Sequence, residues 1–110
     1  MNEMKKLVGV AACPAGIAHT YIAAETLIKF AKKHGYDLKM ETNGAGGTEN
    51  RLTEEDIEEA EAIVLAVDTM VEMERFRGKP VLTVSSSDAI HRGEQVIQQI
   101  VDGKAEVYNP

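Results

Sequence analysis

The chain has 110 residues, 44% of them apolar and 27% charged, which are ordinary values for a folded domain and exclude disorder, collagen and coiled coil. We therefore expect residues 1–110 to form a single domain. The net charge of −6 argues against a nucleic acid partner, because such binding requires lysine and arginine to neutralise phosphates. No apolar run approaches the roughly 20 residues of a membrane helix, and the short run before Cys13 predicts neither a signal peptide nor direct membrane insertion.

Strand and helix patterns alternate along the first half of the chain. The continuous apolar run Leu7–Ala12 predicts a strand that is buried on both faces. The loop Cys13–Thr20 follows, and then a helix to about His34, which we expect to stop at a left-handed Gly35. Asp37–Thr42 alternates polar with less polar residues, which predicts a strand at an edge of the sheet. The expected core face of the helix carries Ile17, Tyr21, Ala24, Ile28 and Ala31.

The same alternation continues in the second half. After the glycine-rich loop Asn43–Asn50, Thr53–Asp56 resembles a capping box and starts a short acidic helix. The apolar run Ala62–Val67 predicts a central strand. In Asp68–Phe76, a spacing of three between apolar residues predicts a short helix with two methionines, Met70 and Met73, in the core.

A strand and a final helical region complete the pattern. Val81–Val84 predicts the fourth strand, and Ser85–Ser87 caps the helical region that follows. The side chains expected on its core face are those of Val96, Ile97, Ile100 and Val101.

This order predicts an α/β, Rossmann-like, three-layer sandwich with a four-stranded parallel sheet in the order 2-1-3-4. In such a sheet, ligands bind beyond the carboxyl ends of the strands, at the switch point between strands one and three. The loop that contains Cys13 leaves the first strand at that point. Because Cys13 is the only cysteine, an internal disulfide, a CxxC redox pair and a zinc site with several cysteines are excluded, and we expect no metal and no cofactor.

The loop Cys13–Thr20 has the features of a phosphoryl cradle. A loop between a buried strand and a helix directs backbone N–H groups into a concavity, and the helix dipole adds partial positive charge. Gly16 allows the required backbone conformation, and Pro14 stiffens the loop. The same surroundings favour a nucleophilic thiolate at Cys13, so the loop predicts a covalent thiophosphate intermediate. The residues expected to bind the phosphoryl group are Pro14, Ala15, Gly16, Ile17, Ala18, His19 and Thr20.

The spacing of this loop resembles that of the low-molecular-weight protein tyrosine phosphatases. Cys13, five residues and His19-Thr20 match their C-x5-R-[ST] loop, with histidine in place of arginine. Arginine holds a phosphoryl group through a bidentate fork, which imidazole cannot provide. The change favours a site that accepts a phosphoryl group and then releases it. A cysteine-dependent phosphatase is the alternative, with Asp68 as the only evident general acid, and a noncatalytic anion-binding domain is a third hypothesis.

Further segments extend the resemblance to one family, the fructose-type IIB component of the bacterial phosphoenolpyruvate-dependent sugar phosphotransferase system. The similarity runs from about Leu7 to Ile100. It departs mildly at Ala15, where threonine is common, and at Asn43, where glutamine is frequent. The segments are CPAGIAHT at Cys13–Thr20, Ala23–Glu25, Glu41–Gly44, Glu49–Leu52, Asp56-Ile57 and Glu74–Phe76.

This resemblance implies a phosphocarrier in sugar uptake. Cys13 falls on the family's phosphocysteine position. It would accept a phosphoryl group from a phosphohistidine of the IIA component and pass it to a sugar, fructose by default, held in the membrane IIC component. The location implied is cytoplasmic, at the inner face of the membrane through IIC. We expect IIA to dock around the rim of Cys13–Thr20 and part of Asn43–Asn50 rather than on the acidic helix.

Overall fold

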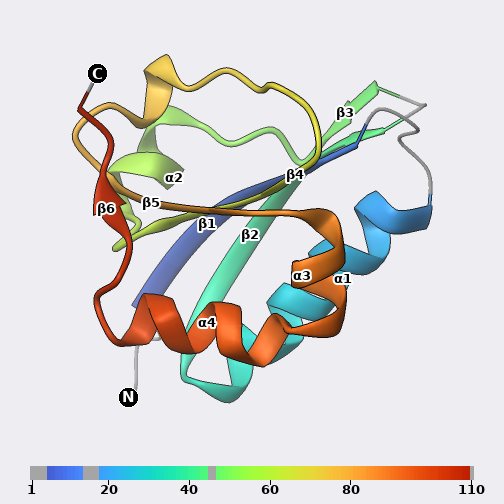
Figure 1. Ribbon diagram of the computed structural model, residues 1–110. Helices are drawn as coiled ribbons and strands as arrows, with labels where there is room; N and C mark the ends of the chain where they lie inside the picture. Colours follow the sequence, from blue (N-terminus) through green and yellow to red (C-terminus); the bar gives the residue numbers. More distant parts are fainter. Residues whose placement is uncertain (1–4, 14–17, 45–46, 110) are drawn as a thin grey trace.

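The computed structural model describes residues 5–13, 18–44 and 47–109, and its centre is a mixed β-sheet with helices on both faces (Figure 1). The strands lie in the order β3-β2-β1-β4-β5-β6. The four inner strands are parallel, which confirms the predicted 2-1-3-4 order and the α/β class. Their bounds are β1 Lys5–Ala12, β2 Tyr36–Gly44, β4 Ile63–Val67 and β5 Pro80–Val84.

Two short antiparallel strands extend the sheet at its edges, so the predicted count of four strands is wrong. β3, Gly47–Glu49, pairs with the end of β2, and β6, Glu106–Val107, pairs with the start of β5. Within the predicted strand Asp37–Thr42, only Thr42 pairs with β3, so the rest of that strand has β1 as its single described neighbour and lies at an edge, as predicted. Every residue of β3 and β6 is exposed, so neither strand carries an apolar pattern that the sequence could reveal.

Each face of the sheet has its own apolar core. One face is covered by α1 (Ala18–Lys33), α3 (Ser86–His91) and α4 (Gly93–Val101), and the other by α2 (Glu54–Glu59) and the 3₁₀ turn η1 (Glu74–Phe76) (Figure 1). The side chains of β1 alternate between the two cores because successive residues of a strand point to opposite faces. Both cores thus fix β1, and with it the position of Cys13 at its end. None of the helices in the described residues has the length and apolar content needed to cross a bilayer.

The ends of α1 and α2 follow the predicted local chemistry. Gly35 has a φ of +84°, the left-handed conformation expected after the last turn of α1. Thr53 accepts a hydrogen bond from the backbone N–H of Asp56, whose carboxylate accepts one from the N–H of Thr53, so the capping box is present. The predicted core face of α1 is partly wrong: Ile28 is exposed, and the buried side chains are those of Thr20, Ala23, Ala24, Leu27 and Ala31.

The predicted final helical region consists of two helices, α3 and α4. Ser85 caps α3 by accepting the N–H of Asp88, as predicted, but the chain breaks at Arg92 before α4 begins. The predicted core positions in α4 are buried except Val101, which lies at the exposed end of the helix.

The helix predicted over residues 68–76 is wrong. Only Glu74–Phe76 forms a helical turn, and the preceding residues have no regular structure. The Met70 side chain is 97% exposed, whereas Val71 and Met73 pack against the core beneath α2. Burial therefore follows the period of two of an extended chain instead of the spacing of three that suggested a helix.

Candidate functional site

Cys13 follows the last residue of β1, at the carboxyl end of the parallel strands. The register places the preceding residue, Ala12, between Asn43 of β2 and Val67 of β4. The Cys13 thiol is half-buried and forms no disulfide. Helix α1 begins at Ala18, so four residues connect the thiol to the start of the helix. The cysteine therefore lies at the switch point of the sheet, where the sequence predicts it.

The structure describes the last three residues of the predicted cradle. Ala18 and His19 are exposed in the first turn of α1, whereas Thr20 is fully buried. Among the described residues, the Thr20 hydroxyl has no hydrogen-bond partner. The other predicted phosphoryl-binding residues lie outside the described residues, so their role stays a prediction: Pro14, Ala15, Gly16 and Ile17.

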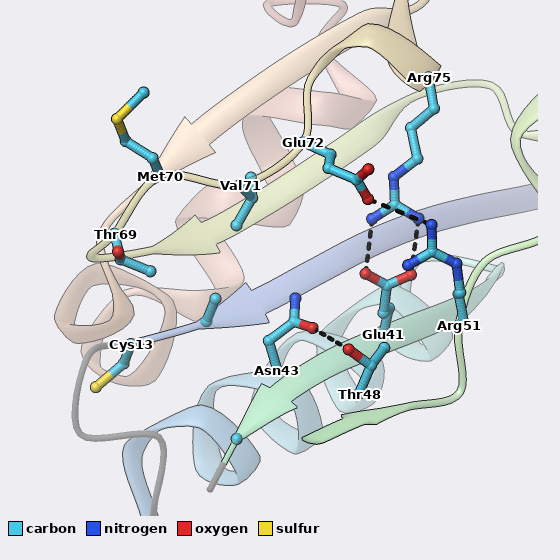
Figure 2. Close-up of a pocket in the computed structure, with 12 residues that line it drawn as sticks. Cys13, Glu41, Asn43, Thr48, Arg51, Thr69, Met70, Val71, Glu72 and Arg75 are labelled. Atoms are coloured by element: carbon cyan, nitrogen blue, oxygen red, sulfur yellow. Dashed lines mark hydrogen bonds and ion pairs between the residues drawn. The ribbon is translucent and has the colours of Figure 1, made fainter. Parts of the chain in front are cut away.

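A polar pocket of about 300 Å³ opens beside Cys13 on the α2 face of the sheet (Figure 2). Cys13 lies at one end, and the guanidinium groups of Arg51 and Arg75 lie at the other; Ala12 also lines the pocket. One side is formed by the β2–β3 hairpin, and the opposite side by the segment between β4 and η1. The remaining lining residues are Glu41, Asn43, Gly44, Thr48, Thr69, Met70, Val71 and Glu72.

The hairpin side of the pocket presents an amide with a fixed orientation. The Thr48 hydroxyl donates a hydrogen bond to Asn43 Oδ1 over 2.6 Å, which leaves the Asn43 amide N–H groups available to the pocket (Figure 2). These residues belong to the glycine-rich segment Asn43–Asn50. Three of its described residues, Asn43, Gly44 and Thr48, thus line the pocket beside Cys13.

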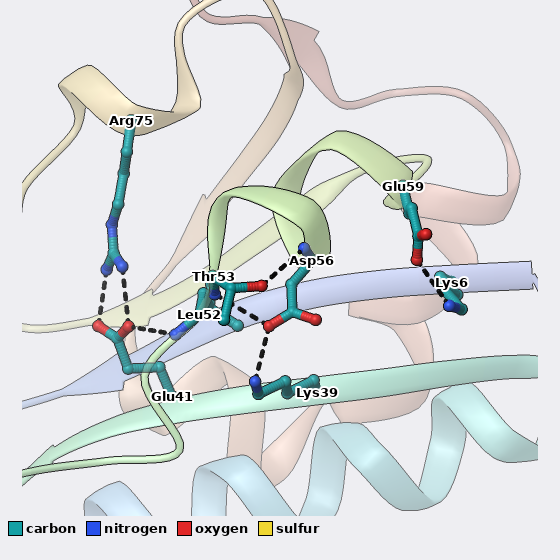
Figure 3. Close-up of polar contacts among 8 residues, drawn as sticks. All are labelled: Lys6, Lys39, Glu41, Leu52, Thr53, Asp56, Glu59 and Arg75. Carbon is teal, nitrogen blue, oxygen red and sulfur yellow. Dashed lines mark hydrogen bonds and ion pairs between the residues drawn. The ribbon is translucent and has the colours of Figure 1, made fainter.

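A buried ion pair joins the two sides of the pocket. The Glu41 carboxylate, only 1% exposed, accepts hydrogen bonds from Arg75 Nη1 at 2.8 Å and Nη2 at 2.6 Å (Figure 3). It also accepts the backbone N–H of Leu52 at 2.9 Å. The Arg75 guanidinium lies 4.8 Å from the centroid of the Phe76 ring, which is fully buried. The Glu41 carboxylate therefore connects three parts of the chain: β2, η1 and the segment that follows β3.

The surroundings of this pair keep both groups ionised. Burial alone would raise the pKa of the Glu41 carboxyl, but the hydrogen bonds from Arg75 and Leu52 and the nearby positive charges outweigh it, so the pKa lies below its ordinary 4.5. The hydrogen bond to Glu41 raises the pKa of Arg75 further. Near the mouth of the pocket, a second pair, Arg51 and Glu72, makes a looser contact of 3.3 Å between exposed side chains.

Asp68, the candidate general acid, lies directly after β4. Its backbone N–H donates to the carbonyl of Ala12 at 2.9 Å, and its Oδ1 accepts the backbone N–H of Ser86 at 3.0 Å. It shares a second pocket of about 310 Å³ with His19 and residues of α3, among them His91. The structure thus places Asp68 and His19 on one pocket and Cys13 on the other.

Sequence reasoning gave Glu41 and Arg75 no role. The alternating pattern of Asp37–Thr42 suggested that one face of that strand is exposed, yet Glu41 is buried. The two residues are 34 positions apart, so no local pattern connects them. The one feature of the sequence that pointed to these two residues is that both lie within segments that resemble the IIB family.

Comparisons with known proteins identify the family. Residues 8–99 match the model of the family described as "PTS system, Lactose/Cellobiose specific IIB subunit". The chain is 44% identical over 98 residues to the "PTS system fructose-like EIIB component 2" of Escherichia coli K12, a match that covers 88% of this chain and 92% of that protein. This chain, an α/β domain with a cysteine at the switch point of its sheet, belongs to the IIB family of the sugar phosphotransferase system.

Its fructose-type relatives include much longer proteins. The "PTS system fructose-specific EIIABC component" of Bacillus subtilis is 46% identical over 103 residues, which is 94% of this chain but only 16% of that protein. Among solved structures, a domain of the fructose-specific IIABC component of Borrelia burgdorferi has a TM-score of 0.91 and 45% identity, and the match covers 96% of this chain and 100% of that domain. The predicted resemblance is therefore confirmed, and so is the predicted fold.

Proposed function

We propose that this chain is a phosphocarrier in which Cys13 accepts a phosphoryl group from a phosphohistidine of a IIA component. It then passes the group to a sugar held by a membrane IIC component. Membership of the IIB family supports the carrier role, and the names of the relatives favour fructose. The observation that carries the proposal is the position of the chain's only cysteine, at the end of a central strand, beside a polar pocket and before the start of α1.

The chemistry consists of two in-line displacements. In the first, the Cys13 thiolate attacks phosphorus, an S–P bond forms, and the N–P bond of the phosphohistidine breaks, with its electron pair returning to imidazole. In the second, the sugar hydroxyl attacks, an O–P bond forms, and the thiolate leaves. The proton of that hydroxyl passes to a base of the membrane partner, because a thiolate leaves without protonation. Backbone N–H groups of the cradle would spread the charge of the equatorial oxygens.

Two residues in the first turn of α1 would assist this exchange. His19 is exposed and can donate one hydrogen bond to a phosphoryl oxygen. Thr20 is buried, and its hydroxyl has no partner among the described residues, so it is available to the thiolate or to a backbone group of the cradle. A cytoplasmic location at the inner face of the membrane follows from this proposal, since the domain would meet IIC there.

The test is phosphoryl transfer from a panel of purified, phosphorylated IIA proteins, read by intact mass and then by peptide mapping. We expect one phosphoryl group on Cys13 and none on Cys13→Ala. Label on His19, or full labelling of the Cys13→Ala variant, would contradict the proposal. Turnover of a small aryl phosphate separates the carrier from the alternative, a cysteine-dependent phosphatase. We expect none, since this chain has His19 in place of the arginine with which the phosphatases hold the phosphoryl group.

A further inference from the structure

The segment from Thr69 to Glu72, here called the pocket wall, is irregular in structure yet fixed at both ends. At its start, the N–H of Asp68 donates to the carbonyl of Ala12, the residue before Cys13. At its end, Arg75 is bound to the buried Glu41 of β2. Val71 packs inward on the core, and Met70 projects into solvent beside the pocket (Figure 2).

The exposure of Met70 is unusual for its position. The side chain is 97% exposed, the highest value among the exposed large apolar residues of the described chain. It lies on the rim of the pocket that Cys13 also lines. A flexible, polarisable methionine is well suited to a protein contact, because it adapts to the surface that it meets. In-line transfer requires the donor protein to surround the thiol, so the wall lies where the donor must dock.

Stability alone does not explain the Glu41–Arg75 pair. Well-packed apolar residues of similar volume usually replace a buried ion pair without loss of stability. The pair does provide a fixed geometry: two parallel hydrogen bonds from a planar guanidinium set both the distance and the angle between β2 and the residues next to the wall. Figure 3 shows the carboxylate between Arg75 on one side and Leu52 on the other.

We propose that Glu41 and Arg75 are positioning residues that hold the pocket wall, with Met70 at its tip, in the place where the phosphoryl donor protein docks beside Cys13. This inference rests on the proposed function, because it needs a donor protein. Glu41 and Arg75 touch no reacting atom. They act through the wall, which they hold across the pocket from the hairpin residues Gly44 and Thr48.

The test uses the double variant Glu41→Leu, Arg75→Met, which removes both charges and keeps an apolar contact. The rate of phosphoryl transfer to Cys13 is measured against the concentration of phosphorylated IIA, together with thermal unfolding and the rate of Cys13 alkylation by iodoacetamide. We expect the variant to fold, with the alkylation rate and kcat unchanged. The KM for phosphorylated IIA should rise on the order of tenfold or more, because a small displacement of the pocket wall moves the docked donor away from the thiol. Met70→Ala should raise KM in the same direction without lowering stability.

Two further variants sharpen the test. If the double variant unfolds, Arg75→Lys keeps the charge but loses the fork, and should raise KM by a smaller factor. The control is Glu58→Lys, Glu59→Lys in α2. Glu59 pairs with Lys6 at the start of β1, whereas Cys13 follows the other end of that strand. This variant should therefore leave transfer unchanged.

The outcomes separate the two proposals. Wild-type protein that accepts no phosphoryl group from any IIA would refute the proposed function. Normal transfer by wild type, together with an unchanged KM in the folded double variant or in Arg75→Lys, would overturn the positioning role alone. A loss confined to kcat, accompanied by altered alkylation, would also overturn it, because the pair would then act on the thiol instead of the wall.

Discussion

Replacing Arg75 alone should reverse the direction in which stability depends on pH. In Arg75→Met, the Glu41 carboxylate loses two of its three hydrogen bonds and its counter-charge while it stays buried. Removing one partner of a buried ion pair costs about 3–5 kcal/mol, a large part of the roughly 5–15 kcal/mol that stabilises a domain. We therefore expect a marginally folded protein at neutral pH.

Proton linkage gives the direction in which the free energy of unfolding changes with pH. In the wild type, the lowered pKa of Glu41 contributes stability above its ordinary value of 4.5, and this stability is lost as the pH falls through the lowered value. In Arg75→Met, burial dominates and raises the pKa, so the folded state binds the proton more tightly than the unfolded state does. Stability should then rise as the pH falls from neutral towards 4.5. Each pH unit relieves at most about 1.36 kcal/mol of the penalty.

Urea unfolding followed by circular dichroism, at several pH values between about 7 and 5, measures this slope. The matched variant is Glu41→Leu, Arg75→Met, which has no buried charge and should recover most of the lost free energy with a flat pH dependence. The reasoning is refuted if Arg75→Met costs less than about 1 kcal/mol, or if its stability does not rise as the pH falls from about 7 to 5.

Three predictions concern the framework that carries the site. A methyl group at Gly9 would lie 2.5 Å from the carbonyl oxygen of Val64 in the neighbouring strand. Gly9→Ala should therefore lower the free energy of unfolding in urea by about 1–3 kcal/mol or more. An unchanged free energy would contradict this close approach. Thr53→Ala removes the cap of α2 and should cost about 0.5–2 kcal/mol, measured in the same way, whereas an unchanged midpoint would mean that the cap contributes nothing. The pKa of Asp56 is lowered from 3.8 to about 2, first by the hydrogen bond from Lys39, so its contribution is complete above 3.8 and is lost as the pH falls through about 2. Asp56→Asn should therefore be less stable at neutral pH and show a flatter acid unfolding curve than the wild type, and parallel curves would exclude this linkage.

The sequence predicted the centre of the fold better than its edges. The runs that form β1 and β4 are apolar throughout because both faces of these strands are covered, and this pattern identifies central parallel strands. β3 and β6 have two or three residues each, all exposed, and their pairing depends on neighbouring strands instead of a pattern of their own. The extended path after β4 was missed because the spacing of Met70 and Met73 suggested a helix. The fixed end at Asp68 and the inward packing of Val71 override that preference.

The candidate site also has one part that the sequence predicted and one that it did not. The position of Cys13 follows from a local signal, a buried strand that ends at a cysteine before a helix. The ion pair between Glu41 and Arg75 depends on a contact between distant segments, and the burial of Glu41 arises from η1 and the chain around Leu52 covering the end of β2. A carboxylate in a strand of alternating polarity looks exposed until the segments that cover it are in place.

The charges around the pocket bear on the choice between a carrier and a phosphatase. Both guanidinium groups that line the pocket already have carboxylate partners, Arg75 with Glu41 and Arg51 with Glu72. At the sequence position where the phosphatases have their arginine, this chain has His19. Within the described residues, no unpaired arginine therefore lines the pocket beside Cys13. Two hydrogen bonds from an arginine would stabilise a phosphocysteine and slow its transfer to an acceptor. Lowering the free energy of an intermediate raises the activation barrier of the step that consumes it. In the proposed carrier, a phosphoryl group held mainly by backbone N–H groups would remain at an intermediate free energy between donor and sugar, which is what two successive transfers require.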